Sequence, residues 1–248
     1  MSTEDLVARL IKQRPLHFTN QYDYTMLRDG TELLGREEWL HVGTTDEHYN
    51  KHIKLAEYLS YDEMILASLL GTSGPSYFIN DGRGDNCSVP GDLGTFETRG
   101  IMVGLVGARF QCPGHMDAAL CLPPDCEKPK YLQHPRLTKI IQEWLGEKPG
   151  YVTVGADDEY DDELKFDDLM YKARMRISSE TLLLEANSCA VEEDRGRKAY
   201  VHLVGLGLGV WMYCEDQIAW FVEEVTATLQ RLSLPHDGTL ELAWIDAD

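Results

Sequence analysis

Residues 200–211 read YVHLVGLGLGVW, and this stretch decides the fold. Residues 200–204 predict a β-strand, and the three glycines at 205, 207 and 209 predict a loop. Apolar residues then recur with a helical period over 216–232, and residues 240–245 predict a final strand. A strand, a glycine loop, a helix and a second strand indicate an α/β fold.

This arrangement is also a physical recipe for holding a phosphate group. Glycines let backbone N–H groups approach an anion, and the loop and the helix that follows direct partial positive charge toward it. The spacing matches neither GxGxxG nor GxxxxGK[ST]. The alternative is a tight structural turn, in which Trp211 belongs to the core rather than to the wall of a ligand site.

Composition narrows the classes of protein further. The 248 residues carry a formal net charge of −19, which argues against a generic nucleic-acid binder. No apolar stretch approaches the ~20 residues of a membrane span, and no signal peptide is recognisable. The six scattered cysteines form no zinc pattern, so we expect a cytoplasmic or nuclear protein with no metal and no cofactor.

Outward from the glycine stretch, the remaining elements are less regular. Residues 1–75 read as helical, with a capping box from Ser60 to Glu63. Strands are expected over 76–80 and over 100–110, the second covered on both faces. A helix is expected over 136–145, with Pro135 suited to its first position and with Ile140, Ile141, Trp144 and Leu145 on its buried face. Another helix is expected over 166–176. Residues 181–184 fit either a strand or a buried helix.

Two further groups of residues carry candidate chemistry. Asn80, Asp81 and Arg83 follow a strand, where ligands bind in open α/β sheets, although Asn and Asp also cap their own turns. Glu185 follows three leucines, and Glu193 lies nearby. Cleavage of a glycosidic bond uses such carboxyl groups, although a solvated helix end is the plainer interpretation.

Two charged features have plainer interpretations. Arg109 either binds an anion or pairs with Asp117, and we favour the pair. The acidic run over 157–163 is expected to be a solvated loop rather than a cation site.

Several of these segments together resemble a known family. They are LEAN at 184–187 through the glycine stretch, VGLVGARF at 103–110, FIN at 78–80 and YKARMR at 171–176. The chain resembles macrodomain-like ADP-ribosyl glycohydrolases, in the divergent branch of the bacterial effector MavL and fungal poly(ADP-ribose) glycohydrolases. The resemblance covers about residues 77–232. It implies a macrodomain-like mixed sheet flanked by helices over 76–248, with residues 1–75 as a helical N-terminal extension packed on it.

The resemblance also implies a function, namely binding ADP-ribose and removing it from proteins by cleaving an N- or O-glycosidic bond at the ribose. The diphosphate would then lie on the glycine loop, and ribose hydroxyls would meet residues near the end of the 76–80 strand. A carboxylate would orient water or stabilise the oxocarbenium charge. The binding residues implied or considered are Asn80, Arg83, Asn187, Gly205, Gly207, Gly209, Val210 and Trp211, and the catalytic candidates are Glu185, Glu193 and Asp81.

Two other functions stay open from the sequence. A reader module would bind ADP-ribose without cleaving it, and it needs the glycine loop but no catalytic carboxylate. An acidic interaction protein would use the loop only as a turn. The expected partners are ADP-ribose or an ADP-ribosylated protein, with mono- and poly-ADP-ribose both open.

Overall fold

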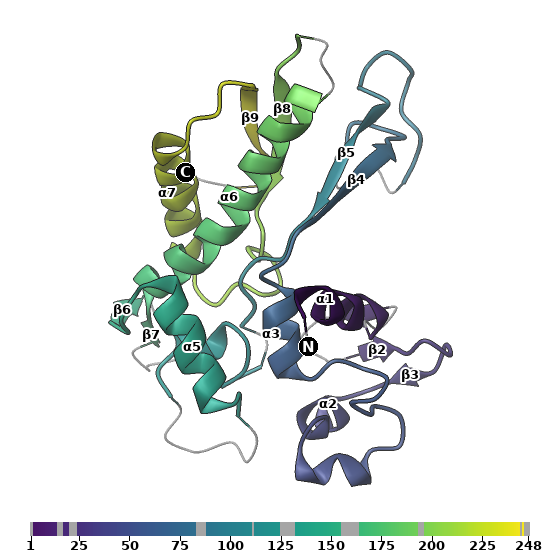
Figure 1. The fold of residues 1–248 in the computed structure, drawn as a ribbon, viewed down its shortest axis with the longest axis vertical. Coiled ribbons are helices and arrows are strands. Elements are labelled where there is room, and N and C mark those ends of the chain that lie inside the picture. Colours follow the sequence, from purple (N-terminus) through teal and green to yellow (C-terminus); the bar gives the residue numbers. More distant parts are fainter. Residues whose placement is uncertain are drawn as a thin grey trace.

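The computed structural model describes residues 2–13, 17–19, 24–82, 88–110, 112–124, 132–154, 164–192, 196–243 and 245. Helices and short strands alternate through these residues, which confirms the α/β class (Figure 1). The strands pair as four small sheets, in the orders β1-β2-β3, β4-β5, β6-β7 and β8-β9. Within the described part of the chain they do not join into the single mixed sheet that the resemblance implies. None of the described helices has the length and apolarity to cross a membrane.

The C-terminal third forms the predicted strand–loop–helix–strand unit. Strands β8 (Ala199–Val204) and β9 (Asp237–Ala243) pair in parallel, with helix α7 (Asp216–Arg231) between them in the chain. Parallel neighbours need such a crossover, because a tight turn reverses the chain direction. The predicted strand over 200–204 and the predicted helix over 216–232 are therefore confirmed.

Helix α6 (Asp168–Glu192) is a single 25-residue helix that lies beside α7 (Figure 1). It contains residues 168–176 of the helix predicted over 166–176, whose expected start is wrong because Phe166 ends a short strand (β7, Leu164–Phe166) and α6 begins at Asp168. The ambiguous residues 181–184 also lie in α6 and are therefore helical. Leu182 and Leu183 are buried, whereas Leu184 is half exposed. A short apolar run such as 181–184 fits a strand and a buried helix equally well, so its periodicity alone does not decide between them.

Strands β4 (Thr72–Tyr77) and β5 (Arg99–Gly104) form an antiparallel hairpin that projects from the rest of the molecule (Figure 1). The expected strands over 76–80 and 100–110 are wrong in their bounds, since β4 begins at Thr72 and β5 ends at Gly104. The expectation that the second strand is covered on both faces is also wrong. Ile101 is 40% and Met102 is 61% exposed, because this two-stranded hairpin is not packed between two other layers of the protein.

The first 75 residues contain helices and also a small sheet. Ser60 caps α3 with Glu63 at its third position, so the predicted capping box is confirmed. Residues 50–60 are not helical, although they bury Ile53 and Leu59. The elements are α1 (Thr3–Lys12), β1 (His17–Thr19), β2 (Tyr24–Met26), β3 (Glu32–Leu33), α2 (Glu37–His41), the 3-10 helix η1 (Thr45–Tyr49) and α3 (Tyr61–Ala67).

Four shorter elements complete the chain: α4 (Ala118–Cys121), α5 (Pro135–Leu145), β6 (Val152–Val154) and β7 (Leu164–Phe166). Pro135 occupies the first position of α5, as predicted, where its missing N–H costs no hydrogen bond. Ile141 and Leu145 are buried, but Ile140 and Trp144 are 58% and 60% exposed. The predicted buried face of this helix is therefore half right, because only one narrow stripe of α5 is covered.

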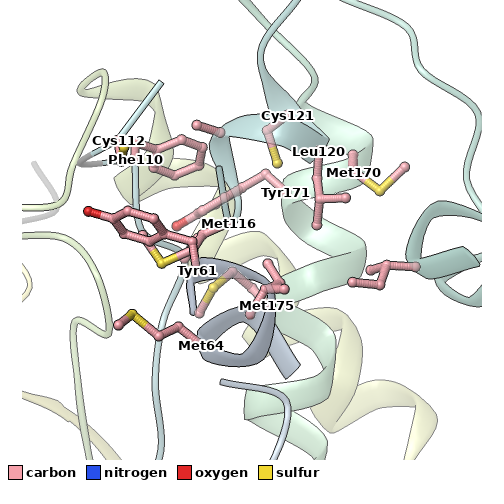
Figure 2. Close-up of a cluster of buried hydrophobic side chains, with 14 of the residues drawn as sticks. Tyr61, Met64, Phe110, Cys112, Met116, Leu120, Cys121, Met170, Tyr171 and Met175 are labelled. Carbon is pink, nitrogen blue, oxygen red and sulfur yellow. The ribbon is translucent and has the colours of Figure 1, made fainter. Parts of the chain in front are cut away.

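The main core joins three distant segments of the chain. Figure 2 shows side chains of α3, of residues 110–121 and of α6 packed into one cluster. The labelled members are Tyr61, Met64, Phe110, Cys112, Met116, Leu120, Cys121, Met170, Tyr171 and Met175. This cluster packs α3 against α6 and against the segment that follows β5.

Candidate functional site

The glycine loop, residues 205–209, is a tight turn that follows β8. The Leu208 N–H donates to the Gly205 carbonyl at 3.1 Å, and Gly207 has a φ of 82°. A positive φ at the third residue of a turn is typical of a type II turn and favours glycine there. The Met212 N–H then donates to the Gly209 carbonyl at 2.8 Å, which continues the turn toward α7.

The glycine loop lies directly on the backbone of the segment that follows β5. A Cβ added at Gly107 would overlap the Leu206 carbonyl group and lie 2.7 Å from the Gly207 nitrogen. A Cβ added at Gly207 would lie 2.5 Å from the Ala108 carbonyl oxygen. Only glycines at positions 107 and 207 allow the two backbones to approach this closely. We call residues 106–109, on which the loop packs, the platform.

The outer end of the glycine loop is open to solvent. Nothing lies within 4 Å of a Cβ built at Gly209, and Val210 is 71% exposed. Of the residues predicted to bind a diphosphate, Gly205 and Gly207 form the base of the loop. Gly209 and Val210 form its accessible part.

Trp211 and Arg109 come together beside the loop. The Arg109 guanidinium lies 5.8 Å from the centre of the Trp211 ring, and its Nη2 donates to the Met64 carbonyl at 3.1 Å. Trp211 is partly buried, and its indole Nε1 has no hydrogen-bond partner among the described residues. The Trp211 ring is thus both a packing surface and a neighbour of a cation next to the glycine loop.

The Asp117 carboxylate lies beneath the platform, where it makes two contacts. Its Oδ2 accepts the Arg109 backbone N–H at 2.7 Å, and its Oδ1 lies 3.2 Å from the Arg174 Nε. The predicted pairing of the Arg109 side chain with Asp117 is therefore wrong, because Asp117 accepts the Arg109 backbone N–H and pairs with another guanidinium. The guanidinium of Arg174, on α6, forms an ion pair with Asp117, and both side chains are 0% exposed.

Glu185 lies on the same helix as Arg174 but eleven residues further on, about 16 Å along the axis at 1.5 Å per residue. Its Oε1 accepts a short hydrogen bond from the Ser73 hydroxyl of β4 and lies 3.5 Å from the Cys189 sulfur. The carboxylate is therefore partly covered where the base of the hairpin meets α6. The described contacts place Glu185 at this junction and not on the glycine loop itself.

The amide side chains proposed as ligand contacts are engaged within the protein. Asn187 accepts the His236 backbone N–H at 3.0 Å and so holds the chain just before β9. Asn80 accepts the Gly82 N–H at 3.0 Å and donates to the Val89 carbonyl at 2.8 Å. These bonds are those of a residue that shapes its own loop.

Asn80 and Asp81 lie beyond the outer end of β4, a six-residue strand about 17 Å long at roughly 3.3 Å per residue. The hairpin carries them away from the glycine loop (Figure 1). The structure therefore does not bring these two residues together with the predicted diphosphate site.

Two predicted site residues, Arg83 and Glu193, lie outside the described residues, as does the acidic run over 157–163. In the part of the chain that the structure describes, no three His, Cys, Asp or Glu side chains gather as metal ligands.

Sequence reasoning missed the positions of Arg174 and Asp117 beneath the site. The available signal was the placement of Arg174 among Met170, Tyr171, Met175 and Ser178, which share one helical face and are all buried. A charged residue in the middle of an apolar stripe indicates a buried partner, because an unpaired buried charge is very costly.

Comparisons with known proteins cover nearly the whole chain. A family model described as "ADP-ribosylhydrolase MavL-like" matches residues 1–121 and 151–248. One ADP-ribosylarginine hydrolase of Drosophila melanogaster is 33% identical over 269 residues, covering 98% of this chain and 51% of the relative. A second from the same organism is 30% identical over 260 residues, covering 96% of this chain and 50% of the relative. The chain thus spans about half the length of the curated relatives it matches.

Proposed function

The chain belongs to the MavL-like family of ADP-ribosylhydrolases, and from this premise we propose that it removes ADP-ribose from arginine side chains of modified proteins. Membership of this family confirms the predicted resemblance to ADP-ribosyl hydrolases. The arginine linkage is part of the proposal, and its support is that both curated relatives are named ADP-ribosylarginine hydrolases.

The observation that carries the proposal is the form of the glycine loop. Its base is fixed against the platform at Gly107, and its outer end at Gly209 and Val210 presents backbone to solvent. A rigid turn with accessible amides, followed by a helix, suits a diphosphate. In a chain with a formal net charge of −19, such backbone dipoles let an anionic ligand bind without a surface rich in Lys and Arg.

The reaction breaks the bond between the ribose C1″ and a guanidinium nitrogen of arginine. Water supplies a hydroxyl group to C1″ and a proton to the departing nitrogen, so the products are ADP-ribose and unmodified arginine. A carboxylate that orients the water, or that stabilises the oxocarbenium charge, accelerates this step. We assign this role to Glu185, which is partly covered and is positioned by Ser73.

The proposal is tested with a purified protein that carries a single ADP-ribose on arginine. Free ADP-ribose is measured by chromatography, and binding of ADP-ribose is measured by isothermal titration calorimetry. We expect turnover of the arginine-linked substrate, and binding that is lost in Gly209→Val, whose added Cβ would meet no protein atom within 4 Å and whose side chain would cover the open end of the loop. Gly74→Ala is the matched control, because Gly74 is also free of neighbours within 4 Å and lies in β4.

Three outcomes would replace this proposal. Binding without turnover of any linkage identifies a reader module. Turnover of a serine-linked or a poly(ADP-ribose) substrate alone corrects the linkage. A Kd weaker than about 1 mM, which corresponds to roughly −4 kcal/mol, rejects ADP-ribose as the ligand and favours the interaction protein. A macrodomain architecture and a cytoplasmic location remain predictions from the sequence.

A further inference from the structure

Arg174, on α6, joins its helix to two parts of the molecule that lie far from it in the sequence. Its Nη2 donates to the Ser68 carbonyl at 3.1 Å, to the Val106 carbonyl at 2.9 Å and, at 3.5 Å, to the Gly107 carbonyl. Its Nη1 donates to the Ser178 hydroxyl at 3.2 Å, within α6. Ser68 follows α3, whereas Val106 and Gly107 belong to the platform.

The ion pair with Asp117 adds a second support for the platform. Asp117 Oδ2 accepts the backbone N–H of Arg109, at the end of the platform. Arg174 donates to the carbonyls of Val106 and Gly107, at its start. The ion pair therefore holds both ends of the platform by hydrogen bonds. Arg109 in turn donates to the Met64 carbonyl of α3. Two arginines therefore connect α3 to the segment beneath the glycine loop.

The contact between Gly107 and Gly207 transmits this arrangement to the loop. Because a Cβ at either position would overlap the opposing backbone, the loop packs against the platform with no space between the two backbones. A shift of the platform must be followed by Leu206 and Gly207. Well-packed interiors transmit such shifts, since they hold few voids.

We propose that Arg174, held by Asp117, is a positioning residue that sets the glycine loop in the conformation that binds the diphosphate of ADP-ribose. The identity of the ligand in this inference rests on the proposed function. The positioning of the loop by Arg174 does not depend on it. A guanidinium suits this role because its planar fork presents five donors at fixed angles, whereas a lysine ammonium is a compact point charge. The requirement is therefore for the geometry of the donors and not only for a positive charge.

Arg174→Lys separates geometry from charge. It keeps a cation but offers one nitrogen where Arg174 uses three, so it cannot reach Asp117, the Ser178 hydroxyl and the platform carbonyls at the same time. We expect the variant to fold and to bind ADP-ribose at least tenfold more weakly. Amide hydrogen exchange should accelerate at least tenfold at Leu208 and Met212, whose N–H groups close the turn. Arg176→Lys is the matched control, because Arg176 lies on the same helix and donates to the Leu145 carbonyl, away from the platform.

A double variant distinguishes positioning from simple charge compensation. Breaking one partner of a buried ion pair is strongly destabilising, whereas replacing both with apolar residues is often neutral. Arg174→Met with Asp117→Leu should therefore unfold at a higher temperature than Arg174→Met alone. It should still show weak ADP-ribose binding and fast exchange at Leu208, because the donors to the platform remain absent.

Ser178→Ala provides a milder test that leaves the buried charges paired. Ser178 accepts from Arg174 and donates to the Val106 carbonyl at 3.2 Å, so its loss should weaken binding two- to fivefold. Wild-type affinity and wild-type exchange at Leu208 in Arg174→Lys, or in the double variant, would overturn the proposal. If the wild-type protein binds no ADP-ribose, the proposed function fails, and the exchange rates alone still decide whether Arg174 positions the loop.

Discussion

Gly107 and Gly207 meet backbone to backbone, although they lie one hundred residues apart in the sequence. A Cβ on Gly107 would lie 2.7 Å from the Gly207 nitrogen, and Gly207 also requires a φ of 82°. The two glycines therefore serve one purpose, which is to let the chain after β8 rest on the chain after β5. This contact connects the C-terminal strand–helix–strand unit to the platform.

Gly207→Ala should be much more destabilising than Gly209→Ala. Alanine at Gly207 would be strained by the positive φ and would place its Cβ 2.5 Å from the Ala108 carbonyl oxygen. Strain of this kind costs about 1–3 kcal/mol, and overpacking adds a similar amount, so we expect a loss of about 2–6 kcal/mol in the free energy of unfolding. Urea denaturation followed by circular dichroism measures it.

Gly209→Ala is the matched control for this substitution, because its Cβ would meet nothing within 4 Å. Its free energy of unfolding should stay within about 0.5 kcal/mol of the wild type. Equal losses for the two variants would contradict the close contact between loop and platform.

Glu185→Gln tests the assignment of the catalytic carboxylate. The amide keeps the size of the side chain and still accepts the Ser73 hydroxyl, but it can neither activate water nor carry negative charge. We expect release of ADP-ribose from an arginine-linked substrate to fall about 10²–10⁴-fold while the Kd for ADP-ribose changes little.

Glu180→Gln is the control for Glu185→Gln. Glu180 lies on the same helix and forms an ion pair with Arg231 at 2.8 Å near the surface. This variant should retain wild-type turnover. If Glu185→Gln also retains it, the catalytic carboxylate lies elsewhere, and Glu193 and Asp81 are the next residues to substitute.

Features set by local sequence could be predicted. The capping box at Ser60, the helix that begins at Pro135 and the strand–loop–helix run after residue 199 all depend on neighbouring residues and periodicity. The glycine loop was found for the same reason, since three glycines within five residues are a local signal. The family resemblance depends on this glycine stretch and on short motifs at 78–80, 103–110, 171–176 and 184–187, which are also local signals.

Features set by distant contacts could not be predicted. The exposure of Met102 depends on the absence of a covering layer over the hairpin, and the sequence of β5 alone does not contain that information. Asn80 and Asn187 are polar residues of a type that binds ribose, but Asn80 accepts the nearby Gly82 N–H and Asn187 accepts the distant His236 N–H. The pairing of Arg174 with Asp117 spans 57 positions, so only the placement of a charge on a buried helical face hinted at it.

Glu63→Ala should weaken the N-terminal helices. The Glu63 carboxylate accepts the Ser60 N–H at 3.0 Å within the capping box and lies 2.6 Å from the Arg9 Nε of α1. Loss of a cap costs about 0.5–2 kcal/mol and loss of this partly buried ion pair about 1 kcal/mol or less, so we expect a loss of about 0.5–3 kcal/mol in the free energy of unfolding. Thermal unfolding measures it, with Glu57→Ala as the control because Glu57 is exposed and lies outside any helix. Equal stability of the two variants would show that α1 is not held through Glu63.

His115 should make the protein less stable in mild acid. Its ring is 5% exposed and lies 4.6 Å from the Tyr61 ring, and burial lowers the pKa of His115 below its usual 6.5, partly opposed by the negative charge of Asp62.

The sign of this effect follows from proton binding. Below pH 6.5 the unfolded chain takes up a proton at this position before the folded protein does, so the contribution of His115 to stability is complete above pH 6.5 and declines as the pH falls through it. Urea denaturation at half-unit intervals from pH 7.5 to pH 5 should therefore show a steeper loss of stability in the wild type than in His115→Gln. The difference between the two slopes of unfolding free energy against pH should correspond to the uptake of at most one proton. His48→Gln, at an exposed histidine, should keep the wild-type slope, and parallel slopes for the wild type and His115→Gln would mean that His115 takes up its proton equally in both states.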